Sequence, residues 1–417
     1  MAEGYTTHDF TTSRRAVDER ESEFLCDAGQ ASDQNLKQCL CYGSIMPRGV
    51  GPNGRLARLR RSENRGAPPI DFDEFWGRTL SALSGIESLP RPVTNEEIST
   101  SLADLVEFKS WGLQNVRCWF SHRQAVGGPA RPLLVTSHGY GGASDPERVR
   151  RLSSLGFDVV AVDIRGFGLS RGAVPSLSPF GHVLTGCDSR ETSILRGGLC
   201  DFIQAYRAGL SWFQNTSGVC FQGFSYAGGL AVMAAAVLSM HGRNWGDLPI
   251  PPPPDLLAVG APSLGHLEKR LQLCRGGSGA ELVEYLRQYP MRRHELLRVF
   301  SYYDTSFFAS YLGQFHDVTG QVKPSQVICG VGLHDPIVPP ETVYAIYNAL
   351  PIRHELMELP CSHTDLPEEA EWIKWESAWI RALRPVTAPL ALRKGHLDVD
   401  QAERDQDNEQ HSRNVGS

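Results

Sequence analysis

Residues 219–229, with the sequence VCFQGFSYAGG, decide how this chain can be interpreted. The apolar start predicts a strand, the glycines predict a tight turn at Ser225, and the small apolar residues up to Leu238 predict a helix. Small residues around such a turn let the strand and helix pack closely and leave the serine hydroxyl exposed. A Gly-x-Ser-x-Ala string alone is a weak signal, but its position between a strand and a helix strengthens it. The stretch therefore predicts a nucleophilic serine at position 225.

A serine hydroxyl needs a base that takes its proton and a carboxylate that orients this base. Asp335 and His363 follow Ser225 in the order Ser, Asp, His, and each comes after an apolar run that predicts a strand. Loops at strand ends are the places where such residues are found. We therefore predict that Ser225, Asp335 and His363 form a catalytic triad.

Other histidines and another aspartate compete for these roles. His138 belongs to a glycine-rich loop, and His334 precedes Asp335 on the same short turn. His354 also competes, but only His363 follows the last predicted strand. Asp163, at the end of an apolar run, is an alternative acid, although its setting in the sequence DIRG favours a structural role in hydrogen bonding.

The segment HGYGG at residues 138–142 follows the first strand of the predicted parallel core. Its glycines allow the backbone to come close to a ligand. The backbone N–H groups of Tyr140 and Tyr226 are predicted to form an oxyanion hole, which stabilises the negative charge on an attacked carbonyl oxygen. The chain has no Gly-x-x-x-x-Gly-Lys-Ser phosphate loop, so HGYGG is interpreted as an oxyanion loop.

Strands and helices are predicted to alternate from Leu133 onward, which implies an α/β fold with a mostly parallel, doubly wound sheet. The predicted strands are 115–120, 133–136, 159–162, 219–221, 256–259, 327–331 and 356–359, and the predicted helices are 146–155, 190–213, 229–238, 341–350 and 368–383. A further helix is expected to start near Asp71, with this residue as its cap. Structure is expected to begin near Pro68.

Three parts are predicted along the chain. Residues 1–66 form a flexible N-terminal extension, residues 67–390 form the α/β domain, and residues 391–417 form a disordered tail. Within the domain, residues 265–321 form a helical, lid-like insertion before the strand that leads to Asp335.

Composition excludes several classes of function. The chain has 417 residues and a net charge of −6, which gives no basic field for nucleic acid. It has no run of about 18 apolar residues, so we expect no membrane association and a cytoplasmic location. Its 10 cysteines are dispersed and are interpreted as reduced thiols. No metal-binding pattern occurs, and no cofactor is expected.

Several motifs resemble one family of the α/β-hydrolase superfamily, the acetyl xylan esterases and cephalosporin C deacetylases of carbohydrate esterase family 7. The resemblance extends from about Pro69 to Leu383. It is carried by DFDEFW at 71–76, HGYGG at 138–142, DIRGFGLS at 163–170, GFSY at 223–226, YYD at 302–304 and, most specifically, GLHDPIVPPETVYAIYN at 332–348. The resemblance implies the α/β-hydrolase fold, and it implies that Arg165, Gly166 and Phe167 support the site or line the substrate pocket.

The chain departs from this family at three motifs. Phe167 and Tyr226 replace two glutamines, Ala227 replaces a glycine, and Thr364 follows His363 in place of a glutamate. Two amides near the site are thereby exchanged for aromatic rings, which favours apolar surface over hydrogen bonds to sugar hydroxyls.

The leading hypothesis is a serine carboxylic-ester hydrolase that removes acetyl or another short acyl group from a small-molecule ester. The alternative is an acyltransferase that uses the same triad, and a non-catalytic binding protein with this fold is a third reading. A peptidase is less favoured because the chain lacks the large β-rich N-terminal domain of the prolyl oligopeptidases. The resemblance also implies a possible homo-oligomer.

Overall fold

The computed structural model describes residues 52–94, 101–124, 127–241, 250–363 and 369–383. The chain divides into two compact units, residues 1–57 and residues 58–417. The described part of the first unit is the start of helix α3 (Pro52–Leu59). All elements that follow α3 belong to the second unit. The predicted tail 391–417 and Thr364 lie outside the described residues, as do residues 1–51 of the predicted extension.

The strands of the second unit form a mixed sheet whose order within the described residues is β1-β2-β3-β5-β4-β6-β7-β10-β11. Strands β5, β4, β6, β7, β10 and β11 are parallel to one another, whereas β1, β2 and β3 form an antiparallel end, in which β3 pairs with β5. The strands are β1 (Arg91–Pro92), β2 (Asp104–Lys109), β3 (Asn115–Phe120), β4 (Arg131–Ser137), β5 (Asp158–Val162), β6 (Thr216–Phe224), β7 (Leu256–Gly260), β10 (Gln326–Gly332) and β11 (His354–Leu359).

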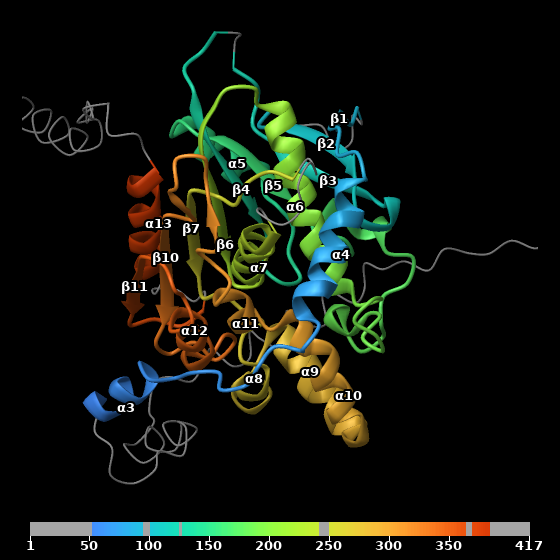
Figure 1. The fold of residues 1–417 in the computed structure, drawn as a ribbon, viewed down its shortest axis with the longest axis vertical. Coiled ribbons are helices and arrows are strands. Elements are labelled where there is room, and N and C mark those ends of the chain that lie inside the picture. The colour runs from blue at the N-terminus through green and yellow to red at the C-terminus, as the bar shows by residue number, and fades with distance from the viewer. Residues whose placement is uncertain (1–51, 95–100, 125–126, 242–249, 364–368, 384–417) are drawn as a thin grey trace, which may run out of the picture. The chain divides into compact units, whose positions relative to one another are not determined.

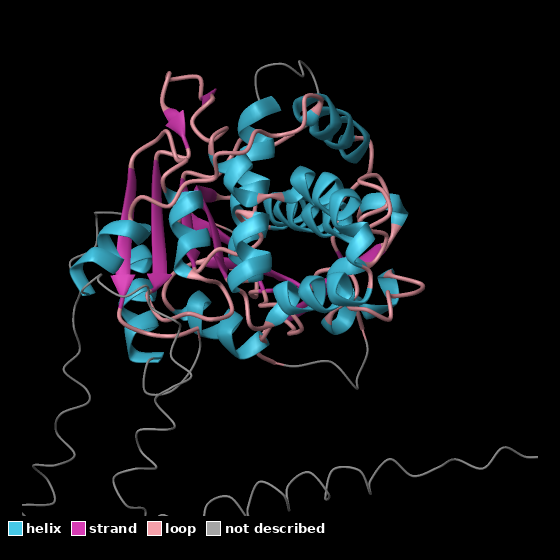
Figure 2. Cartoon of the chain, turned by 90° about the horizontal axis from the view of Figure 1, so that it is seen from below, coloured by secondary structure: helices cyan, strands magenta, loops and turns pink. Residues whose placement is uncertain are grey.

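Helices cover both faces of this sheet (Figures 1 and 2). Helices α6 and α7 pack against β4 to β7 on one face, and α5 and α13 lie on the other, where Arg151 pairs with Glu376. The helices are α4 (Phe72–Ser84), α5 (Pro146–Ser154), α6 (Ile194–Trp212), α7 (Tyr226–His241), α12 (Pro340–Tyr347) and α13 (Glu369–Leu383). Parallel strands covered on both faces are largely apolar, as in β5, which is buried along its whole length and apolar after Asp158.

Every predicted strand and helix is present; β3 has the predicted bounds, and the others have shifted ends. The pattern missed β1 and β2, because both lie before the regular alternation begins. Asp71 precedes α4 as expected, but its carboxylate makes no capping bond with the helix. It accepts hydrogen bonds from the Tyr302 hydroxyl and from Arg190 Nη1 instead, and both partners are too distant in sequence for a local pattern to indicate them.

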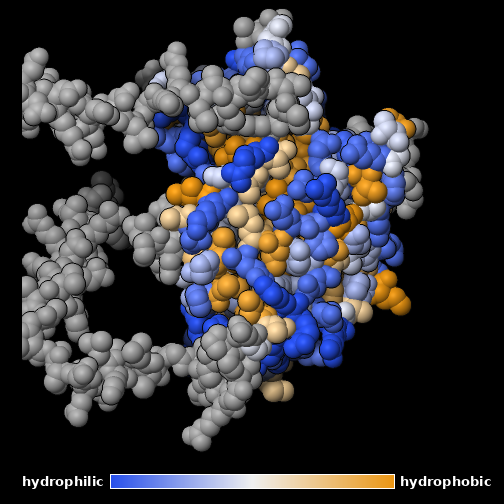
Figure 3. Space-filling view, turned by 90° about the vertical axis from the view of Figure 1, so that its left-hand side faces the viewer, coloured by the Kyte–Doolittle hydropathy of each residue, from blue (hydrophilic) through white to orange (hydrophobic). Residues whose placement is uncertain are grey.

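Ordered structure starts before Pro68, the position that the sequence suggested. Arg60 forms a bidentate ion pair with Glu358 on β11, and the Asn64 side chain donates to Ser306 Oγ at 2.9 Å. Arg60 and Asn64 therefore have partners on the domain, which composition alone does not reveal. Figure 3 shows the side of the molecule on which β11 and α13 lie, with hydrophilic and hydrophobic residues interspersed.

The predicted insertion at 265–321 is largely helical. It contains α8 (Leu267–Leu273), α9 (Gly277–Gln288), α10 (Arg293–Phe300) and α11 (Thr305–Ala309), which lie together at one end of the sheet in Figure 1. A small hairpin, which the pattern did not predict, spans its end: β8 (Phe315–His316) lies within the predicted bounds and β9 (Val322–Lys323) just after them. Among the helices of the described segments, none has the length and hydropathy needed to cross a membrane.

Candidate functional site

Ser225 lies on the tight turn between β6 and α7, as predicted. Its φ of +57° is in the left-handed region, which a serine adopts only when the surrounding structure holds it there. The neighbouring glycine is required, because a Cβ on Gly223 would lie 2.3 Å from the backbone of Ala227. The Ser225 N–H donates to Gly260 O on β7 at 2.8 Å, and its carbonyl accepts from Ser263 N–H at 3.0 Å. The turn is therefore fixed from both sides.

The structure brings the three predicted triad residues together. His363 Nε2 lies 3.0 Å from Ser225 Oγ, and His363 Nδ1 lies 2.6 Å from Asp335 Oδ2. All three side chains are buried. The imidazole thus lies between a hydroxyl that can donate a proton and a carboxylate that can hold the Nδ1–H tautomer.

The loop after β10 fixes the Asp335 carboxylate. Its Oδ1 accepts from the Ile337 and Val338 N–H groups, both at 2.8 Å, so that Oδ2 is left for the imidazole. His363 follows β11, the neighbour of β10 in the sheet. Two adjacent parallel strands therefore deliver the acid and the base to one edge.

The competing residues have other roles. His138 Nδ1–H donates to Gly139 O at 2.8 Å and its Nε2 accepts from Ile164 N–H at 3.1 Å, and burial lowers the pKa of this imidazole. Asp163 accepts from Ser144 N–H at 2.6 Å and from Leu169 N–H at 2.8 Å. These bonds join the oxyanion loop to the loop that contains Arg165. His334 is exposed on the turn before Asp335.

One of the two predicted oxyanion donors, Tyr226, directly follows the serine in the chain. Tyr226 is the first residue of α7, so the helix provides no carbonyl partner for its N–H. The loop that carries Tyr140 is closed by a hydrogen bond from Gly142 N–H to Gly139 O at 3.0 Å. The Tyr140 side chain leaves this loop and donates its O–H to Glu281 Oε2 on α9 at 2.6 Å. The insertion therefore contacts the loop directly.

Arg165, predicted to support the site or line the pocket, is buried and paired with an acidic residue. Its guanidinium makes two hydrogen bonds to the buried carboxylate of Asp201 on α6, at 2.9 and 2.6 Å. The Asp201 carboxylate also accepts from Ser110 Oγ at 2.6 Å. Gly166 has a φ of +84°, and a Cβ there would lie 2.8 Å from the His182 ring. The motif thus packs against the interior.

Phe167 and Tyr226 belong to an aromatic cluster with Tyr140 and His182. The Phe167 ring stacks on His182 with 3.9 Å between centroids, and the rings of Tyr140 and Tyr226 lie 5.4 Å apart. Both rings that replace the family's glutamines are buried. Their burial therefore speaks against the expectation that these rings give the substrate an apolar surface. They pack against Tyr140 of the oxyanion loop and against His182 instead.

Sequence reasoning missed Asp201, His182 and Glu281. Asp201 and Glu281 lie on predicted helices, where an acidic residue ordinarily faces solvent. His182 begins a short 3₁₀ helix (His182–Leu184), where it donates Nε2–H to Arg165 O at 2.9 Å, and burial lowers its pKa to about 4. No local pattern distinguished these residues from their neighbours.

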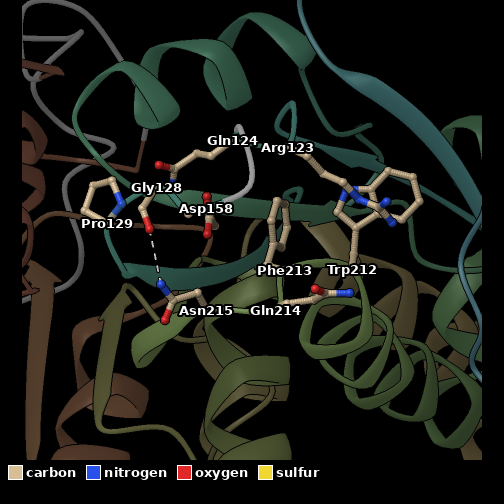
Figure 4. A pocket seen from close by; sticks show the side chains of 10 residues that line it. Arg123, Gln124, Gly128, Pro129, Asp158, Trp212, Phe213, Gln214 and Asn215 are labelled. Carbon is tan, nitrogen blue, oxygen red and sulfur yellow. Dashed lines mark hydrogen bonds between the residues drawn. The ribbon is translucent and has the colours of Figure 1, made fainter.

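Two cavities lie at different positions relative to the candidate site. One of about 210 Å³ borders the oxyanion loop and the elbow, and His138, Gly139 and Phe224 line it. Another, of about 290 Å³, is lined by Arg123, Asp158 and Asn215 among others (Figure 4). Asp158 begins β5, and Asn215 precedes β6. The second cavity therefore lies at the amino ends of the parallel strands, whereas ligands of such sheets bind at the carboxyl ends.

A model of the acetyl xylan esterase family matches residues 54–377. The chain belongs to this family. Two solved structures are similar to it: the acetyl xylan esterase from Paenibacillus sp. R4 is 22% identical, over 78% of this chain and 99% of that one, with a TM-score of 0.63. Acetyl Xylan Esterase 1 from Thermoanaerobacterium sp. JW/SL YS485 is 21% identical, over 79% of this chain and 99% of that one, with a TM-score of 0.63.

These comparisons confirm the family resemblance and the α/β-hydrolase fold. At 22% and 21% identity, the two structures show that the fold is shared. The activity of this chain follows from its membership of the acetyl xylan esterase family. The chain is an esterase, a hydrolase of carboxylic esters.

Proposed function

We propose that this esterase removes a short acyl group, most simply acetyl, from a small-molecule alcohol through an acyl-enzyme on Ser225. The observation that carries the proposal is the pair of contacts at His363, 3.0 Å from Nε2 to Ser225 Oγ and 2.6 Å from Nδ1 to Asp335 Oδ2. A serine is a weak nucleophile until a base in this arrangement takes its proton. The acetyl group is suggested by the family, and an acetylated sugar or secondary metabolite is the substrate class we favour.

The first half of the reaction follows from these contacts. Ser225 Oγ attacks the ester carbonyl carbon while its proton moves to His363 Nε2, and Asp335 stabilises the resulting imidazolium. Negative charge on the carbonyl oxygen is stabilised by the N–H groups of Tyr140 and Tyr226. The tetrahedral intermediate collapses as the imidazolium protonates the leaving alcohol oxygen. The acyl group then remains on Ser225.

The second half repeats these steps with water. His363 takes a proton from the water as its oxygen attacks the acyl carbon, and the proton then returns to Ser225 Oγ as the carboxylic acid leaves. Capture of the same intermediate by an alcohol would give acyl transfer, so the products formed with and without an added alcohol distinguish the two reactions.

The test is hydrolysis of p-nitrophenyl acetate, butyrate and octanoate by the wild type and by Ser225→Ala. We expect the acetate to be favoured and kcat to fall by roughly 10⁴- to 10⁶-fold in the variant. Ser263→Ala is a matched control, because it removes another buried serine hydroxyl beside the elbow, one without a hydrogen-bond partner among the described residues. Undiminished turnover by folded Ser225→Ala protein would disprove the proposed nucleophile.

A further inference from the structure

Two motifs of the family resemblance, DFDEFW at 71–76 and YYD at 302–304, have no part in the proposed reaction. The structure brings them together, because Trp76 Nε1–H donates to Tyr302 O at 3.1 Å. The second motif ends in Asp304, whose carboxylate is buried and caps α11. A buried carboxylate needs hydrogen-bond donors, and two of those that Asp304 has are backbone N–H groups where the loop after β7 meets α8.

This loop, residues 261–266, has an unusual backbone. Ala261, Leu264 and His266 have φ values of +40°, +68° and +48°, in the left-handed region that residues with a Cβ rarely adopt. Such conformations persist only where contacts from the surrounding structure hold them, and they are common at functional sites. The contacts of this loop connect it to the proposed nucleophile.

Ser263 in the loop contacts the elbow through its backbone. Its N–H donates to Ser225 O at 3.0 Å, and a Cβ on Gly229, in the first turn of α7, would lie 2.5 Å from Ser263 O. Directly before the loop, Gly260 O accepts from Ser225 N–H at 2.8 Å. The elbow is therefore bonded to this loop and packed closely against it, so a shift of the loop would also shift Ser225.

Thr305, the first residue of α11, holds Ser263 from the other side. It is fully buried, and its Oγ1–H donates to Ser263 O at 2.8 Å. Its backbone N–H donates to Leu264 O at 3.2 Å. Thr305 thus fixes two consecutive carbonyl groups of the strained loop, and the first of them belongs to the residue that bonds to Ser225 O.

We propose that Thr305 is a positioning residue for the nucleophile, which acts through Ser263 on the position of Ser225 Oγ relative to His363 Nε2. This inference rests on the proposed function, in which Ser225 is the nucleophile. Attack by this oxygen has strict geometric demands. Loss of the Thr305 hydroxyl should therefore lower kcat and leave KM nearly unchanged.

The test is Thr305→Val, which keeps the branched shape of the side chain and removes its hydroxyl. We expect kcat on p-nitrophenyl acetate to fall by about 30-fold, since a misplacement of about 1 Å costs roughly 100-fold, and KM to change by less than about twofold. With enzyme in excess over ester, release of p-nitrophenol reports acylation of Ser225, and it should slow by a similar factor. Thr305→Ser retains the donor and should restore kcat to within about threefold of the wild type.

Two controls separate positioning from a general loss of stability. Thr79→Val also removes a buried hydroxyl, one that donates to Phe75 O at 2.8 Å within α4, and it should keep the wild-type kcat even if Tm falls. Ser263→Ala should keep it too, because both bonds of Ser263 are made by its backbone. Thr305→Cys, whose thiol is a weak donor, should have an intermediate kcat and replaces Thr305→Val if that variant does not fold.

Two results would overturn the inference. One is a wild-type kcat in folded Thr305→Val or, in its place, Thr305→Cys, because the hydroxyl would then support only the fold. The other is an equal loss of kcat in Thr305→Val and Thr305→Ser, because the hydroxyl would then not be the group that matters. Undiminished turnover by Ser225→Ala would instead contradict the proposed function.

Discussion

The elbow region and the helix pair α8–α9 differ in how their buried polar groups are satisfied. Around Ser225, both nitrogens of His363 and both oxygens of Asp335 have partners before any substrate is present. On the helix pair, Arg270 Nε has none among the described residues. Buried polar groups are ordinarily paired, so an exception needs an explanation. His363 and Asp335 are thus held in place by the protein itself, whereas the Arg270 guanidinium bonds to Ser278 alone among the described residues.

Apart from Ser225→Ala, the substitution near the elbow with the largest expected effect is Asp335→Asn. The amide can keep the bonds from Ile337 and Val338 but cannot hold the Nδ1–H tautomer of His363 as a carboxylate does. We expect kcat on p-nitrophenyl acetate to fall by about 10⁴-fold with the fold retained.

Asp317→Asn is a suitable control for this variant. Asp317 also accepts two backbone N–H bonds in a turn, at 2.8 and 3.0 Å, but its turn lies between β8 and β9, away from the proposed triad. It should leave kcat within about twofold of the wild type, because surface changes away from a site have small effects. Equal activity of Asp335→Asn and wild type would remove Asp335 from the mechanism.

The sequence was sufficient to predict the elements that bring the triad together. Each triad residue follows a strand of one parallel sheet: Ser225 follows β6, Asp335 follows β10 and His363 follows β11. Because parallel strands end at a common edge, local patterns were enough to predict that the three side chains lie close together. The Arg165–Asp201 pair and the Tyr140–Glu281 bond could not be predicted in this way. Both join residues on separate elements, and their geometry depends on tertiary packing.

His182, which stacks on Phe167 and donates to Arg165 O, should make the free energy of unfolding depend on pH. Burial lowers the pKa of this histidine from 6.5 to about 4, so the unfolded chain takes up a proton in this window while the folded chain does not. Stability is therefore lost as the pH falls from 6.5 toward 4. From pH 8 to pH 5 this residue should account for about 2 kcal/mol of the decrease in the free energy of unfolding.

Denaturant unfolding at pH 8 and pH 5 checks this expectation with His182→Gln, whose amide can still donate to Arg165 O. The decrease between the two pH values should be smaller in the variant by about that 2 kcal/mol. His354→Gln, on the edge strand β11, should keep the wild-type decrease. Identical pH dependence of His182→Gln and wild type would show that another group is responsible.

The smallest expected effect concerns the bond that joins the two compared regions, from the Tyr140 hydroxyl to Glu281. Tyr140→Phe keeps the backbone N–H that we assign to the oxyanion hole but loses this bond, and it also loses the acceptor for Val183 N–H, at 2.8 Å. If the helix pair positions the loop through this hydroxyl, kcat should fall by about tenfold while KM changes little, because a transition-state interaction is weakened. Glu281→Gln retains an acceptor and should lose less.

Tyr206→Phe is the control for Tyr140→Phe. It removes a buried hydroxyl that lies away from the site and donates to Pro252 O at a distance of 3.1 Å, so it should lower stability and leave kcat unchanged. Equal kcat values for Tyr140→Phe and Tyr206→Phe would show that the elbow needs no support from the insertion, and that the two regions act independently.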